Sequence, residues 1–111
     1  MAVSSPVLNI LVLDDCPTAE ILLTGDLDMT ADGALAEVVA EILIDPQVVR
    51  IEVDVAGLAY VDACGVAALF RASQRAANFG VCLRLVRVRP PLRRLLDCTE
   101  VWRSLADPEW G

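Results

Sequence analysis

The residues most able to do chemistry lie in the segment YVDACGVAALF, residues 60–70, where Asp62, Cys64 and Gly65 stand close together. A β-type run ends in an acid, and an apolar helical run follows a turn of small residues. A side chain at such a helix start meets unpaired backbone N–H groups, which stabilise a thiolate or a phosphate. Asp62 works against this, because its negative charge disfavours a second anion. Cys64 is therefore a reactive thiol, a switch, or a small residue that fits a tight turn.

Two further carboxylates, Asp26 and Asp28, stand in the segment GDLD before a predicted helix. They either bind a metal ion or stabilise the helix start, where a negative charge meets the positive end of the helix dipole. The second interpretation fits the pattern better, so we expect no metal site.

The composition removes most catalytic arrangements. Among its 111 residues the chain has no histidine, and all nine basic residues are arginines. Ser-His and Cys-His pairs, lysine Schiff bases and the P-loop lysine are therefore absent. The four cysteines include no C-x-x-C pair, which argues against structural zinc. The sequence predicts a protein that is not an enzyme and has no cofactor.

The charge and the N-terminus indicate a location and a class of partner. A net charge of −7 argues against nucleic-acid binding, which needs a basic surface. The start MAVSSPVLNI does not read as a signal peptide, and no apolar run is long enough to span a membrane. We expect a cytoplasmic protein that binds no membrane. One basic stretch, RLVRVRPPLRR, is either a solvated face or a site for an acidic partner patch.

The elements that position these residues follow from hydrophobic periodicity. Two strands (9–14 and 19–25) precede a helix within DLDMTADGALAEVVAEILID, whose apolar face recurs at helical spacing. A strand (48–55), a helix from Gly65 to the NFG segment, a strand (81–88) and two short helices (90–97 and 101–106) follow. In the strand at 48–55, alternate residues are predicted to face inward: Val49, Ile51, Val53 and Val55. In the helix from Gly65, the predicted inward face is Val66, Leu69, Phe70, Ser73 and Ala77.

The order ββαβαβαα predicts an α/β fold. We expect a mixed, mostly parallel β-sheet with right-handed crossovers and with helices mainly on one face. Residues 1–6 are expected to be a flexible tail, and residues 7–111 a single domain.

The sequence resembles the STAS-domain family, in particular bacterial anti-sigma factor antagonists, from about residue 8 to residue 106. Three segments carry the resemblance, in the family's order and spacing: GDLDMTADGALAE, VDVAGLAYVDACG and LRLVRVRPPLRRLLDCTEV. The resemblance implies a mixed β-sheet with flanking helices. It also implies a protein that binds an anti-sigma factor, commonly a serine kinase of the histidine-kinase-like ATPase type, and so releases a sigma factor for transcription.

In the family, the kinase phosphorylates a serine or threonine just before the motif glycine, and this ends the interaction. Here that position is Cys64, the preceding hydroxyl position is Ala63, and the motif acid and glycine are Asp62 and Gly65. A serine kinase cannot use this site in the usual way. The resemblance places partner binding on seven residues: Asp26, Asp28, Asp62, Ala63, Cys64, Gly65 and Val66.

Three hypotheses follow from the missing hydroxyl. The protein is a permanently active antagonist, because a neutral thiol resembles an unmodified serine. Alternatively, oxidation of Cys64 to a sulfinic acid supplies the negative charge that phosphate would otherwise bring. In the third hypothesis the chain is a degenerate STAS module that serves as a scaffold or as a sensor of a small ligand or nucleotide. Both a monomer and a homodimer are compatible with the sequence.

Overall fold

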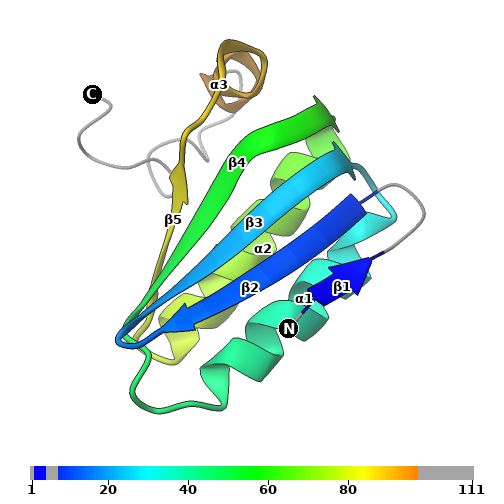
Figure 1. The fold of residues 1–111 in the computed structure, drawn as a ribbon. Coiled ribbons are helices and arrows are strands. Elements are labelled where there is room, and N and C mark those ends of the chain that lie inside the picture. The colour runs from blue at the N-terminus through cyan, green and yellow to red at the C-terminus, as the bar shows by residue number, and fades with distance from the viewer. Residues whose placement is uncertain (1, 5–7, 98–111) are drawn as a thin grey trace.

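The computed structural model describes residues 2–4 and 8–97, which form five strands and three helices (Figure 1). In chain order these are β1 (Ala2–Ser4), β2 (Leu8–Asp15), β3 (Thr18–Leu27), α1 (Ala31–Leu43), β4 (Arg50–Val61), α2 (Ala63–Asn78), β5 (Cys82–Val86) and α3 (Pro90–Asp97). The predicted order is confirmed up to the helix at 90–97. The helix predicted at 101–106 lies outside the described residues.

The five strands form one sheet in the order β1-β2-β3-β4-β5. β1 pairs antiparallel with β2, and β2 with β3, whereas β3–β4 and β4–β5 are parallel. Four strands therefore run in the same direction and only β2 runs against them. The predicted mixed, mostly parallel sheet is confirmed.

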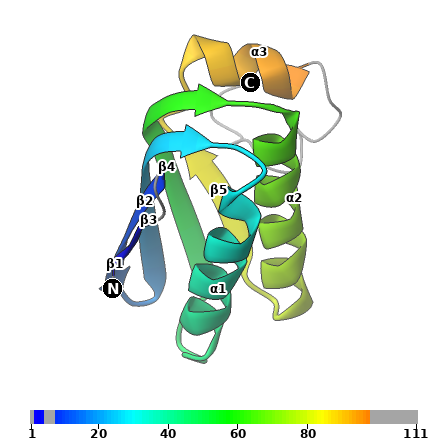
Figure 2. The same cartoon turned by 90° about the vertical axis from the view of Figure 1, so that its right-hand side faces the viewer.

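The helices α1 and α2 pack side by side on one face of the sheet, and α3 lies across its end (Figure 2). The core fills the space between this helix layer and the sheet. It combines alternate residues of the strands, such as Ile21, Leu23, Ile51 and Val53, with apolar helix positions such as Leu69. Helices on one face are confirmed, because the crossovers from β3 through α1 to β4 and from β4 through α2 to β5 lie on the same side.

The inward face of α2 differs from the predicted one. Val66 and Leu69 are buried as expected, but Ala77 is exposed. The remaining buried positions are Gly65 and three alanines, which a search for large apolar residues passes over: Ala68, Ala72 and Ala76.

β4 is longer than predicted and begins later. Val49 is exposed and precedes the strand, while the segment 56–61, expected as a connection, continues it. Two register shifts against β3, one between Leu22 and Thr24 and one between Gly25 and Asp26, insert extra residues into β4. Such bulges break the two-residue alternation, so a strict pattern ends at Val55 although the strand does not.

The N-terminal segment differs from the predicted tail at Ala2–Ser4, which pair with Asn9–Leu11 of β2 as an edge strand. Residues 1, 5 and 6 of the predicted tail are outside the described residues, as is residue 7. Within the described part of the chain, no helix has both the length and the apolar character needed to cross a membrane.

Candidate partner-binding surface

Asp62 fixes the start of α2. It is the N-cap residue in an extended conformation, and its Oδ1 accepts a hydrogen bond of 2.9 Å from the backbone N–H of Gly65. Its backbone carbonyl accepts the first helical bond, from Val66 N–H at 3.0 Å. The cap is therefore Asp62 and not Cys64, which lies two residues later, inside the first turn. Aspartate suits this place because its carboxylate satisfies one of the orphan N–H groups and meets the positive end of the dipole.

Gly65 allows α2 to begin directly against the end of β3. A β carbon at this position would overlap the backbone carbonyl of Leu27. The same carbonyl oxygen accepts a hydrogen bond of 3.4 Å from Asp62 N–H. The turn that carries residues 63 and 64 is thus held to the sheet by a cap, a backbone bond and a close approach that only glycine permits.

This arrangement exposes Ala63 and Cys64 and buries Gly65 and Val66. The backbone N–H groups of Ala63 and Cys64 have no hydrogen-bond partner among the described residues. The side chain of Cys64 is an exposed, free thiol. Of the seven residues predicted to bind a partner, Val66 belongs to the core and Gly65 serves to position the turn.

The acids of the predicted site gather around a residue that the sequence did not single out, Tyr60. Its hydroxyl donates to Asp62 Oδ2 at 3.4 Å, and β3 places Asp26 opposite it in the sheet register. The pKa of Tyr60 is raised, first of all by the negative charge of Asp62. Desolvation, the hydrogen bond to Asp62 and the charges of Asp28 and Asp26 act in the same direction. The spacing of Tyr60 and Asp62 along an extended chain, which puts both side chains on one face, was the available signal.

Asp28 has a structural task at this surface. Its Oδ1 accepts from the backbone N–H of Thr30 at 2.9 Å and from the Thr30 hydroxyl at 2.6 Å. These hydrogen bonds, led by the hydroxyl, lower the pKa of Asp28. Thr30 is the N-cap residue of α1 but makes no side-chain cap bond itself. These contacts support the interpretation that Asp28 stabilises the start of α1.

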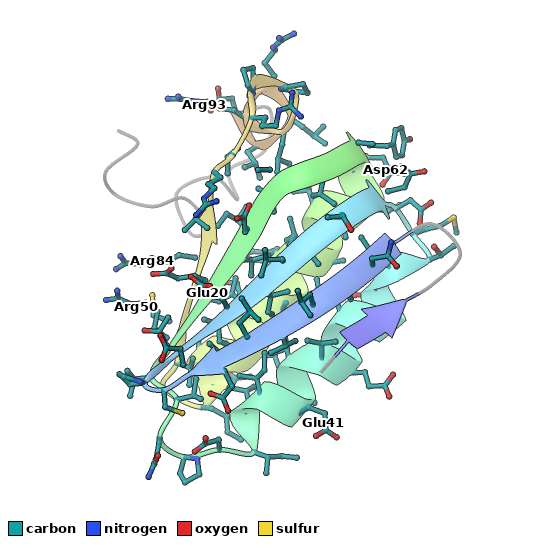
Figure 3. All side chains as sticks on the ribbon, viewed as in Figure 1. Glu20, Glu41, Arg50, Asp62, Arg84 and Arg93 are labelled. Carbon is teal, nitrogen blue, oxygen red and sulfur yellow. The ribbon has the colours of Figure 1, made fainter. Side chains whose placement is uncertain are left out.

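Together, the half-buried Asp26, Asp28 and Asp62 and the exposed Ala63 and Cys64 lie where β3 and β4 end and α1 and α2 begin. Asp62 is seen at this end of β4 in Figure 3. We call these five residues the Cys64 surface. It presents three carboxylates and a free thiol, without the basic residues that a phosphate ligand would need.

A second cysteine, Cys16, lies at the opposite end of β3. Its sulfur is 3.3 Å from a carboxylate oxygen of Asp14 and 3.3 Å from one of Asp45, so the single S–H hydrogen is shared between the two acceptors. These hydrogen bonds raise the pKa of Cys16 to about 12. The three residues form the one group of potential metal ligands within the described chain. Metal binding by this group would require the thiol to lose its proton, which the two carboxylates hold in place.

Comparisons with known proteins give a family and a fold. The sequence matches the family model described as "Mlab, STAS domain" over residues 16–104. No curated protein sequence matches the chain.

Three solved structures illustrate the likeness of fold. An anti-sigma factor antagonist from Mycobacterium paratuberculosis has a TM-score of 0.75 and 19% identity, covering 96% of this chain and 91% of that one. The Bacillus cell fate determinant SpoIIAA in its phosphorylated form has a TM-score of 0.66 and 16% identity, covering 91% and 93%. The murine anion transporter Slc26a9 has a TM-score of 0.73 and 19% identity, covering 86% of this chain but 17% of the transporter. The same fold thus occurs in regulators and in part of a transporter.

Proposed function

Since the chain belongs to the STAS domain family, we propose that it regulates transcription by binding another protein, as an anti-sigma factor antagonist does. In this proposal the partner is an anti-sigma factor of the serine-kinase type in a bacterial cytoplasm, and its capture releases a sigma factor. The likeness in fold to the Mycobacterium anti-sigma factor antagonist, which covers most of both chains, supports this kind of function. It also supports a non-catalytic role.

The observation that carries the proposal is the exposed position of Cys64 in the first turn of α2. Asp62 and Gly65 hold the turn in place, and the family resemblance puts the phosphoacceptor at residue 64. With alanine at 63 and cysteine at 64, the turn offers no hydroxyl to a kinase. A thiol is close to serine in size and is neutral when protonated, so the surface resembles an unmodified antagonist.

We further propose that oxidation of Cys64 controls the binding of the partner. Two molecules of hydrogen peroxide would each transfer one oxygen atom to the sulfur and leave as water, which converts the thiol to a sulfinic acid. The product is an anion beside Asp62, which a partner surface built for a neutral side chain would reject. An exposed free thiol is required for this step, and Cys64 has that exposure.

The alternative, a sensor of a small ligand or nucleotide, has less support. It predicts a pocket at the ends of the first strands, and a cavity of about 240 Å³ does lie there, between β2, β3 and the end of α1. Sites for drug-sized ligands usually measure roughly 300–1,000 Å³. Acids Asp14, Glu41 and Asp45 at its wall would also repel a nucleotide's phosphates.

The test compares residue 64 variants against anti-sigma factors encoded in the same genome. We expect wild type and Cys64→Ser to bind the same factor with similar affinity. Cys64→Asp should bind it at least about tenfold more weakly, because it places a charge in the contact. Cys82→Asp is the matched control, since Cys82 is also exposed but lies at the start of β5.

The kinase reaction gives a second measurement. An anti-sigma kinase should phosphorylate Cys64→Ser and leave the wild type unmodified. Equal binding by wild type and Cys64→Asp would show that residue 64 does not control the contact. Intact-mass spectrometry after mild peroxide treatment tests the redox form, which fails if Cys64 stays unmodified.

A further inference from the structure

The second half of β4 has an open edge. β5 pairs with β4 only from Arg50 to Asp54, whereas β3 accompanies β4 as far as Val61. Among the described residues, no strand lies along the other edge of residues 55–61 (Figure 1). A free strand edge presents unpaired N–H and C=O groups and is a template for another extended chain.

A groove follows this edge. A cavity of about 230 Å³ is lined by β4 between Val55 and Val61 and, across from it, by Arg89, Pro91 and Leu92 at the start of α3. The views of Figures 1 and 2 agree that α3 lies beside this part of β4, beyond the end of β5. We call this feature the β4–α3 groove. Its walls are mostly apolar, which suits the side chains of a bound segment.

The groove is basic at its α3 side, in a chain that is otherwise acidic. Arg89 is exposed, and its guanidinium has no hydrogen bond or ion pair with another described residue. Arg89 directly precedes α3, and Arg93 lies within that helix (Figure 3). By contrast, Arg87 is already paired with Asp54 at 3.3 Å. Arg89 therefore offers an unsatisfied cation beside an apolar groove and an open strand edge.

We propose that the β4–α3 groove binds an extended, acidic peptide segment of another protein by strand addition to β4. The segment's backbone pairs with the open edge, an apolar side chain enters the groove, and a carboxylate pairs with Arg89. This site goes beyond the proposed function and does not depend on Cys64. It gives the protein a second contact surface, bordering the Cys64 surface at Tyr60.

Two features of the groove define its occupant. The two bulges of β4 interrupt regular pairing, so strand addition extends over a few residues and side-chain contacts supply the remaining affinity. The cavity is below the usual volume for a small-molecule site, yet it accepts a side chain of a ligand whose backbone lies outside. The basic rim selects against a basic segment.

A displayed library of random peptides of about nine residues, long enough to span the open edge, tests the proposal. Selection on the full-length protein should enrich peptides that carry Asp or Glu among alternating β-branched residues. Bound peptides should shift the amide NMR signals of residues 55–61 and slow their hydrogen exchange. No enrichment, or shifts confined to other residues, would overturn the proposal.

Matched variants separate the groove from the rest of the surface. Ala59→Trp fills the groove and Arg89→Glu reverses its charge, so each should weaken peptide binding about tenfold or more. Ala40→Trp, on the exposed side of α1, and Arg94→Glu, on α3 outside the lining, should leave binding unchanged. Equal binding by Ala59→Trp and wild type would contradict the site.

Two more measurements keep this proposal distinct from the proposed function. Cys64→Asp should retain peptide binding even though it weakens the anti-sigma contact, so either proposal can fail alone. Sedimentation of the wild type should show that the groove does not join two copies of the chain. A dimer that dissociates in Ala59→Trp would make the groove a self-interface and overturn the proposal.

Discussion

Asp62 uses both carboxylate oxygens, and this joins the helix start to the neighbouring strand. Oδ1 accepts from Gly65 N–H and Oδ2 from the hydroxyl of Tyr60. A residue that the sequence indicates as the family's motif acid is therefore also the residue that organises the site. Its carboxylate lies two residues before residue 64, and a negative charge there disfavours a second anion nearby.

The titration of Tyr60 reports on this charge. Tyr60 is the only tyrosine in the chain, so phenolate absorbance follows it alone. The pKa of Tyr60 is raised, chiefly by the charge of Asp62, so the neutral phenol is favoured in the folded state. The stabilisation is fully present below the unfolded pKa of about 10 and is lost as the pH rises through the folded value.

We predict that Asp62→Asn lowers the midpoint of this titration toward the ordinary tyrosine value, while the amide still caps α2. Glu41→Gln, on α1 at the far end of the molecule, should leave it unchanged (Figure 3). An unaltered midpoint in Asp62→Asn would mean that another group holds the proton on Tyr60.

Gly65 gives a prediction on stability. Gly65→Ala should lower the free energy of unfolding by about 1–3 kcal/mol, because the new methyl group meets the Leu27 carbonyl and the backbone must shift. Urea denaturation measures the change. Gly33→Ala is the control: Gly33 lies in α1 with open space around its Cα, so alanine should stabilise the protein by up to about 1 kcal/mol.

At the scale of elements, small residues determine how closely α2 approaches its neighbours. Its buried face includes Ala68, Ala72 and Ala76, and α1 packs beside it. Such a face leaves little room for larger side chains, because protein interiors are close-packed.

We predict that Ala72→Leu destabilises the protein by about 1–3 kcal/mol through overpacking, as measured by thermal or urea unfolding. Ala77→Leu, on the exposed side of the same helix, should change stability by less than about 0.5 kcal/mol. Equal effects at the two positions would show that helix propensity, and not packing, dominates at Ala72.

The elements also show what could be read from the sequence. Periodicity predicted the helix at 26–45 and the strands around residues 10 and 22, since large apolar residues repeat there at a clear spacing. It missed the second half of β4, where bulges break the alternation, and the alanine face of α2, where small side chains give a weak signal. The family motif indicated the turn at 62–65, and helical periodicity predicted the burial of Val66. The close approach of Gly65 to the Leu27 carbonyl depends on tertiary packing that no local pattern contains.

At the scale of the whole molecule, the central strand of the sheet has more backbone pairing than the edge strand β1. β3 pairs along its length with β2 and β4, whereas β1 pairs over three residues at the outer edge. Local openings release weakly attached elements at a lower free energy than global unfolding does.

We therefore predict that amides of β3 exchange with solvent only through global unfolding, while amides of β1 exchange through local opening. Hydrogen exchange measured across a series of low urea concentrations separates the two, because only global opening has a strong dependence on denaturant. Equal protection of β1 and β3 would indicate that β1 is an integral part of the cooperative unit.

The fixed turn at the start of α2 has a consequence for how such a protein can change over time. The cap by Asp62, the bond from its N–H and the close approach of Gly65 all involve residues other than 64. The conformation of the turn therefore does not depend on which side chain stands at residue 64. A single codon change at residue 64 can alter the chemistry of this exposed position while the molecule around it keeps its shape.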